Sequence, residues 1–235
     1  MSNNLFYLAE RSLDTRICQY LSLDNFIAQL SRREYYISRK GEFEDANEAQ
    51  LPKSQRFLPT LACTIPDKKT RELIQTYDKK VERYYNLSNS FVSCWSTNDN
   101  EDYLMWKNYA STIGVCVVST VGNFIASFKN NEFSRYNVFA APVSYRSVKR
   151  DDSLLDMVFI KSEHYVGESE WRFLFTPKNS ETSKRHNIWL PFDYNVLIDS
   201  VILSPFIQKE TSRFLIDNLK DKFNIMVESS SIAIK

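Results

Sequence analysis

Two glutamates separated by one residue are the part of this sequence best suited to chemistry. Gly167 lets the chain turn, and Glu168 and Glu170 then precede an apolar run that begins at Trp171. At strand spacing both carboxylates point to one face, where like charges are costly unless a cation or hydroxyl engages them. One acid of such a pair can orient a nucleophile while the other stabilises a cationic transition state. The alternative is an exposed pair that Arg172, or one of the lysines nearby, simply neutralises.

Two polar segments nearer the N-terminus could line the same site. Gln19, Tyr20 and Ser22 precede an expected helix, and such side chains at a helix N-terminus can hold an aromatic ring or a phosphate. They are equally suited to packing and to capping the helix. Asp45 and Glu48 lie beside an isolated phenylalanine and form either a ligand-facing lip or ordinary surface. In the first case both segments would face one cleft.

Residues 91–109 combine an apolar strand, a polar turn and a short aromatic helix. Asp99 or Asn100 can cap this helix, and the acids that follow suit the positive end of its dipole. We expect an interior strand with Trp106 mostly buried behind it, because a tryptophan stabilises through buried area. The segment is either plain core or one wall of a ligand site. The side chains of such a wall would be Ser93, Ser96, Trp106 and Tyr109.

The apolar periodicity predicts one α+β domain over residues 1–235, with a mixed or split β-sheet flanked by amphipathic helices. Residues 1–16 are weakly patterned and form an N-terminal extension. Helices are predicted near residues 22–30, 66–85, 121–128, 154–159 and 209–223, and strands near 34–38, 91–95, 114–119, 140–146, 170–176, 188–190, 196–203 and 225–227.

The composition excludes several classes of function. A net charge of +1 gives no general attraction to nucleic acid or to membranes, and a chain with only 4 glycines has no phosphate-cradling glycine motif. The 4 cysteines show no CxxC spacing and there are 2 histidines, so we expect no metal site. We expect neither a signal peptide nor a membrane span, which favours the cytoplasm.

Five short motifs follow one another in a recognisable order. Cys18–Ser22 match Tyr-His-Tyr-Thr-Ser, Phe43–Glu48 match Phe-Asn-Asp-Pro-x-Glu, Ser93–Ser96 match Ser-Cys-Trp-Ser, Met105–Tyr109 match Met-Trp-x-x-Tyr, and Glu168–Arg172 match Glu-x-Glu-Trp-Arg. From about Ile17 onwards the chain therefore resembles a bacterial and phage family catalogued as a domain of unknown function.

A second resemblance concerns mechanism. A His-Tyr segment before a helix, a Ser-x-Ser strand and a later Glu-x-Glu are similar to the marks of mono-ADP-ribosyltransferases. This resemblance implies that NAD is the substrate and that Glu170 is catalytic with Glu168 assisting. It further implies a nucleotide pocket formed by Gln19, Tyr20, Ser22, Ser93, Ser96, Trp106, Tyr109 and Arg172, with Asp45 and Glu48 elsewhere in the cleft.

Two functions of different class follow. The first is an NAD-consuming ADP-ribosyltransferase-like protein, an effector in phage–host conflict that modifies a protein target. The second is a non-catalytic module that binds a nucleotide or a protein on the same aromatic and acidic cleft; an unrelated nuclease or hydrolase is a third. Gln19 stands where the family has a histidine and cannot titrate, which favours the second, whereas the intact acid pair favours the first.

Overall fold

The computed structural model describes residues 5–7, 13–39, 89–110, 113–128, 133–149, 152–153, 155–178 and 187–233. The helix expected over residues 66–85 lies outside the described residues. The same holds for Asp45 and Glu48, the expected acidic lip of the cleft.

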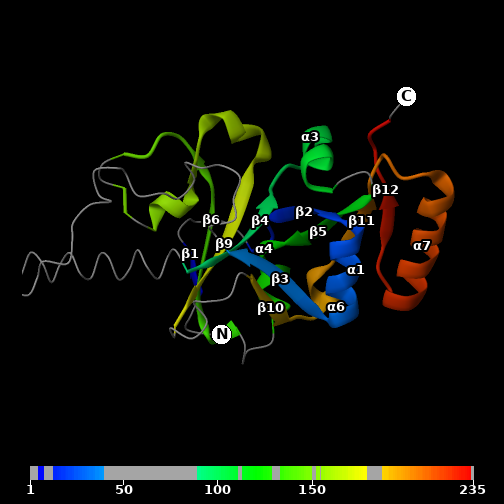
Figure 1. Ribbon diagram of the computed structural model, residues 1–235, viewed down its shortest axis with the longest axis horizontal. Helices are drawn as coiled ribbons and strands as arrows, with labels where there is room; N and C mark the ends of the chain where they lie inside the picture. Colours follow the sequence, from blue (N-terminus) through cyan, green and yellow to red (C-terminus); the bar gives the residue numbers. More distant parts are fainter. Residues whose placement is uncertain are drawn as a thin grey trace, which may run out of the picture.

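A mixed β-sheet of ten strands forms the centre of the described part, which makes the chain an α+β protein (Figure 1). Only the two outermost pairings, β1 with β6 and β11 with β12, are parallel. The strand order is β1 (Leu5–Tyr7), β6 (Tyr136–Pro142), β9 (Glu170–Pro177), β4 (Phe91–Ser96), β2 (Arg16–Ser22), β5 (Gly114–Thr120), β11 (Ser200–Leu203) and β12 (Val227–Ser229), with β3 (Glu34–Arg39) and β10 (Asn187–Pro191) branching from β4.

The sheet is almost split where β2 meets β4. Cys18 and Ser96 are the one residue pair that joins these two strands, whereas the other end of β4 pairs with β3. We call the junction of β2 and β4 the seam. The half-sheets on its two sides are held by longer ladders, β2 with β5 on one side and β4 with β9 on the other.

Side chains alternate between the two faces of the sheet, which we name by their residues at the seam. Face A carries Trp95 and Trp171, and face B carries Ser96 and Glu170. Helices α1 (Leu23–Arg32), α4 (Val121–Ala126), α6 (Tyr194–Leu197) and α7 (Lys209–Phe223) contribute to the main apolar core on face A. Face B is covered by α3 (Tyr103–Met105), the π-helical turn η3 (Trp106–Ala110), the 3₁₀ turns η4 (Asp156–Phe159) and η5 (Glu163–Glu168), and the small sheet of β7 (Ser144–Tyr145) and β8 (Ile160–Lys161).

Strand β9 shows how the core forms. Trp171, Phe173 and Phe175 alternate onto face A and are fully buried, as the sequence predicts. Phe173 stacks on Phe124 of α4 with 3.9 Å between the ring centroids. Leu174 and its neighbours on face B are also buried, because a second apolar cluster that includes η4 covers them.

Local chemistry explains the helix boundaries. Ser22 caps α1 as predicted, since its hydroxyl accepts a hydrogen bond from the Asn25 amide at 3.3 Å. The strand predicted over residues 196–203 begins only at Ser200. The preceding turn is helical because the Asp193 carboxylate accepts from the Asn195 amide and starts α6.

Gly114 allows η3 to approach the sheet closely. A β-carbon at this position would lie 2.1 Å from the Ala110 carbonyl oxygen and 2.6 Å from that of Leu21, distances that require the backbone to shift. We therefore expect Gly114→Ala to lower the free energy of unfolding by about 1–3 kcal/mol, measured by urea denaturation. Gly167→Ala is the control, because nothing lies within 4 Å of its added carbon; equal midpoints for the two variants would contradict this account.

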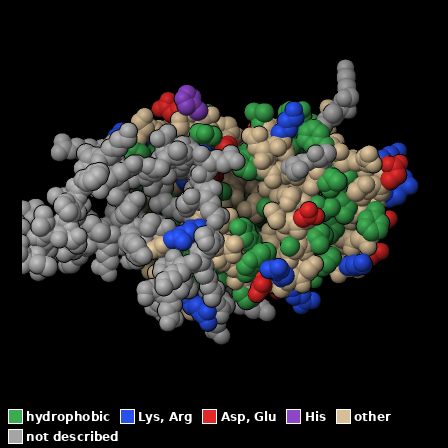
Figure 2. Space-filling view, viewed as in Figure 1, with side chains coloured by type: hydrophobic (Ala, Val, Ile, Leu, Met, Phe, Trp, Pro, Cys, Tyr) green, Lys and Arg blue, Asp and Glu red, His purple; other side chains and the backbone are tan. Residues whose placement is uncertain are grey.

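Charges of both signs are interspersed with apolar side chains over the described part of the surface in Figure 2, in keeping with the net charge of +1. Within the described ranges, no helix is both long and apolar enough to cross a membrane.

Candidate functional site

The segment that the sequence singles out is built as expected in its strand and differs in its helix. Ser93 and Trp95 are buried in β4 and Trp106 is completely buried, so the predicted interior strand and the predicted burial of Trp106 are confirmed. Trp106 packs with Tyr20 of β2 and Cys116 of β5, so it covers these neighbouring strands and not β4 itself. The helix cap is Asp102, whose carboxylate accepts from the Leu104 amide at 2.6 Å, and not Asp99 or Asn100. One α-helical turn then passes into the π-helical turn η3.

Three side chains form a row across face B at the seam. Cys18 of β2 is paired with Ser96 of β4, and Ser96 is paired with Glu170 of β9. Because the row crosses three neighbouring strands in register, all three side chains project to the same face. The row lies between two apolar clusters of face B, one containing Trp106 and the other Leu174.

Glu170 is a buried carboxylate held by two cations. Arg172 donates to both of its oxygens, from Nε at 2.7 Å and from Nη2 at 3.0 Å, and Lys161 Nζ lies 3.4 Å away. The Glu170 amide donates to the Tyr145 hydroxyl at 2.7 Å. Burial raises the pKa of Glu170, and the charge of Lys161 acts against this rise. The arrangement places a fixed negative charge next to Ser96 in a site of low dielectric.

Glu168 reaches the same lysine by a different route from the one predicted. It ends η5, and the left-handed Ser169 (φ 45°) separates it from β9, so simple strand alternation does not relate the two acids. Even so, Glu168 accepts from Lys161 Nζ at 2.6 Å and from the Tyr109 hydroxyl at 3.0 Å. Burial lowers the pKa of Lys161, but the charges of the two glutamates outweigh burial and raise it. Lys161 therefore bridges the acid pair as a cation, a role the sequence alone did not reveal.

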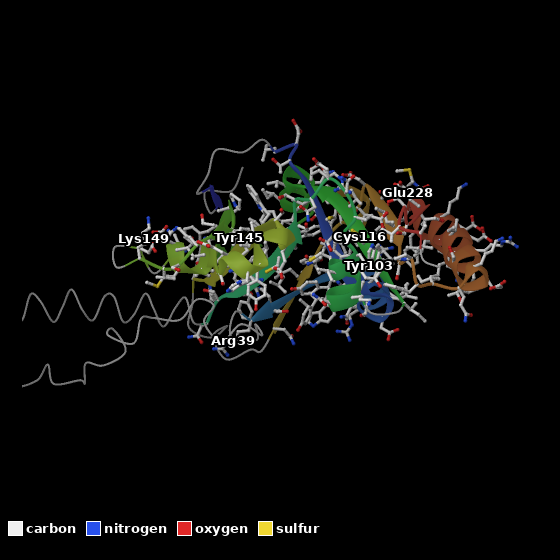
Figure 3. The ribbon with its side chains drawn as sticks, turned by 90° about the horizontal axis from the view of Figure 1, so that it is seen from above. Arg39, Tyr103, Cys116, Tyr145, Lys149 and Glu228 are labelled. Carbon is white, nitrogen blue, oxygen red and sulfur yellow. The ribbon has the colours of Figure 1, made fainter. Side chains whose placement is uncertain are left out.

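Three tyrosines surround this charged cluster. Tyr109 and Tyr165 are exposed, and Lys161 Nζ lies 4.7 Å from the centre of the Tyr165 ring. Burial, opposed in part by the hydrogen bond from the Glu170 amide, raises the pKa of Tyr145 to about 12. In Figure 3 Tyr145 lies on the half of the molecule that carries β7, and Tyr103 lies on the other half. The cluster thus presents aromatic rings and Glu168 towards solvent, with Glu170 behind them.

The prediction that Gln19 and Ser93 line the nucleotide pocket with Glu170 is wrong, because both lie on face A. The Ser93 and Tyr35 hydroxyls are 2.7 Å apart, and Trp95 Nε1 donates to Ser93 Oγ at 2.9 Å. Gln19 accepts from the Tyr35 hydroxyl and donates through Nε2 to the Cys94 carbonyl at 3.1 Å. That last bond crosses the seam, so Gln19 supplies a hydrogen bond where the main-chain ladder between the half-sheets has ended.

A small space lies on face A beside these residues. A cavity of about 10 Å³ lies between the sheet and α1, and Gln19, Gln29, Tyr35 and Trp95 are among its lining residues. Such a cavity has room for about one water molecule. Gln19 therefore borders a space far too small for a dinucleotide.

Tyr20 and Trp106 lie on face B but serve as packing residues. The two rings meet edge to face with their centroids 4.9 Å apart, and the Tyr20 hydroxyl accepts from the Asp102 amide at 3.0 Å. Both side chains are buried, and Ser22 is occupied as the cap of α1. Among the aromatic residues predicted for the wall of the site, Tyr109 is the one that donates a hydrogen bond to an acid of the pair, Glu168.

Arg16 lies on the same face as the acid pair, although it is not among the predicted site residues. Alternation along β2 places it on face B with Cys18, and its Nη1 donates to the Asn98 carbonyl at 2.7 Å, across the seam. Arg16 is partly buried. The sequence predicts no strand here and places Arg16 in the N-terminal extension, so alternation along β2 becomes visible only in the structure.

Comparison with known proteins gives no family assignment. No model of a known protein family matches the chain, and no curated protein matches it. Within the described ranges, no three His, Cys, Asp or Glu side chains are grouped so as to hold a metal ion.

Proposed function

We propose that this protein is an ADP-ribosyltransferase-like enzyme that consumes NAD at the face B side of the seam. The observation that carries the proposal is the row of Cys18, Ser96 and Glu170 across an almost split sheet. The resemblance to mono-ADP-ribosyltransferases was drawn from the segment before α1, the two serines of β4 and the Glu-x-Glu segment. In this chain the serines are Ser93 and Ser96, three residues apart, and the pairing of β4 with β9 puts Ser96 beside Glu170.

The chemistry asked of Glu170 is electrostatic. When nicotinamide leaves with the electrons of the glycosidic bond, the ribose carbon becomes cationic, and a fixed carboxylate nearby lowers the energy of that state. An acceptor on the target then supplies the electron pair for the new bond. Arg172 and Lys161 orient Glu170, and Glu168 lies closer to solvent, where it can align the incoming acceptor.

Two further groups suit the rest of the nucleotide. Arg16 carries five N–H donors, so its guanidinium can bind a phosphate of NAD while it keeps its bond to Asn98. The exposed rings of Tyr109 and Tyr165 provide flat apolar surfaces for an aromatic base. In this proposal, residues of face B take the binding roles that the resemblance to mono-ADP-ribosyltransferases gave to Gln19 and Ser93.

One observation favours a second function, a non-catalytic module that binds a nucleotide or a protein. Both oxygens of Glu170 already accept from Arg172, which reduces the field that this carboxylate can apply to a cationic ribose. A binding module would take up NAD or ADP-ribose on the same face and release no nicotinamide. Binding and turnover together therefore separate the two functions.

Binding is tested by Arg16→Met. Removal of a charge-assisted contact to phosphate should weaken NAD binding by about 10-fold or more, measured by calorimetric titration. Arg213→Met is the matched control, since Arg213 is exposed on α7. Equal NAD affinities for the two variants, or no NAD binding by the wild-type chain, would contradict a nucleotide site at the seam.

A further inference from the structure

The segment after β12 is tied to the element that carries Tyr109. Glu101, just ahead of α3, accepts four hydrogen bonds that join these two parts of the chain. The Ser231 amide and hydroxyl donate to Oε1 at 2.6 and 2.8 Å. The Ser230 hydroxyl donates to Oε2 at 2.6 Å, and Trp106 Nε1 donates to the same oxygen at 3.0 Å.

Apolar packing supports the same attachment. Ile232 packs against the face B cluster that contains Trp106, together with Met105 and Phe206. The Ile232 amide donates to the Ser230 hydroxyl at 3.1 Å, which fixes the turn of the segment. In Figure 3 Glu228 of β12 lies on the same half of the molecule as Tyr103 of α3.

The attachment continues as far as the acid pair. Glu101 bonds Trp106, the first residue of η3, and Tyr109 of the same turn donates to Glu168. Glu168 in turn bonds Lys161. Each step is a direct side-chain contact or a link along η3, so one short helical element connects the segment 230–232 to the acid pair.

We propose that Glu101 is a latch that ties residues 230–232 to η3 and thereby holds Tyr109 against Glu168. When the latch is closed, Tyr109 covers the solvent side of the acid pair. When residues 230–232 detach, η3 loses its outer support and Tyr109 is released from Glu168. The latch is a conformational control of access to face B, and it does not depend on which ligand face B binds.

Two physical features suit Glu101 to this role. Burial raises the pKa of its carboxyl group, but the hydrogen bonds from Ser230 and Ser231 outweigh burial and lower it, so Glu101 stays charged. Hydrogen bonds to a charged acceptor are stronger than those between neutral groups, and they are lost together when the charge is removed. A single carboxylate thus holds several contacts that open as a unit.

Amide hydrogen exchange tests the latch without any nucleotide. In Glu101→Gln we expect residues 227–233 and 103–110 to exchange faster than in the wild type, on the order of 10- to 100-fold. Residues 163–170 should also exchange faster, by a smaller factor. Asp193→Asn is the matched control, because it removes a carboxylate that caps α6 and touches neither segment.

The proposal is overturned if residues 103–110 or residues 163–170 keep their wild-type exchange rates in Glu101→Gln. Should that variant fail to fold, the double variant Ser230→Ala with Ser231→Ala decides by the same criterion. It removes the two hydroxyl donors to Glu101, and leaves the residue 231 amide bond and the bond between Glu101 and Trp106 in place. Faster exchange confined to residues 227–233 would show an attachment that does not reach the site, and would also overturn the latch.

Discussion

Arg172→Met is expected to lower the free energy of unfolding by about 3–5 kcal/mol, because it leaves the Glu170 carboxylate buried without its main partner. Arg172 has no exposed side-chain surface, and it also donates through Nη1 to the Val158 carbonyl. Equilibrium urea denaturation measures the change. Methionine keeps most of the length of the side chain, so the loss reports charge and hydrogen bonds more than volume.

Arg146→Met is the control for an arginine paired at the surface. Arg146 donates to both oxygens of Asp152, but its side chain is one-third exposed (33%), so its loss should cost less than about 1 kcal/mol. The double variant Arg172→Met with Glu170→Leu should recover part of the loss, since no unpaired buried charge remains. Equal midpoints for Arg172→Met and Arg146→Met would show that the buried pair is not the stabilising feature described here.

The sequence predicted the parts of the fold that depend on local pattern. Alternation placed Trp171 in the core, helical spacing predicted that Trp106 is buried, and capping chemistry placed the start of α1 at Ser22. Each of these rests on neighbours within a few residues, so one chain segment contains the whole signal.

The parts that failed depend on register between distant strands. Gln19 and Ser93 lie on the opposite face of the sheet from Glu170. The pairing of β2, β4 and β9 decides this, and no local pattern specifies that pairing. Lys161 was missed for a related reason. It lies 7 residues before Glu168, and only the fold of η5 brings the two side chains together. The acid pair was found because a single residue separates its two members in the sequence.

Glu170→Gln is expected to slow NAD turnover strongly. The substitution keeps the shape and an acceptor but removes the charge, which should cost roughly 3–4 kcal/mol of barrier, or about 100- to 1000-fold in turnover. The Glu170 side chain is 6% exposed and bonded to Arg172, so the substitution also weakens a buried ion pair. We expect Glu170→Gln to be less stable than the wild type, so turnover must be compared below the melting transition of both proteins.

The most direct test of the proposed enzyme is nicotinamide release from NAD by the wild-type chain, Glu170→Gln and the control Glu163→Gln. Glu163 is an exposed acid on η5, so its substitution changes the net charge equally without touching the row at the seam. The account predicts release by the wild type and by Glu163→Gln, and a fall of about 100- to 1000-fold in Glu170→Gln. Full activity of Glu170→Gln, or NAD binding by the wild type with no nicotinamide released, would contradict it.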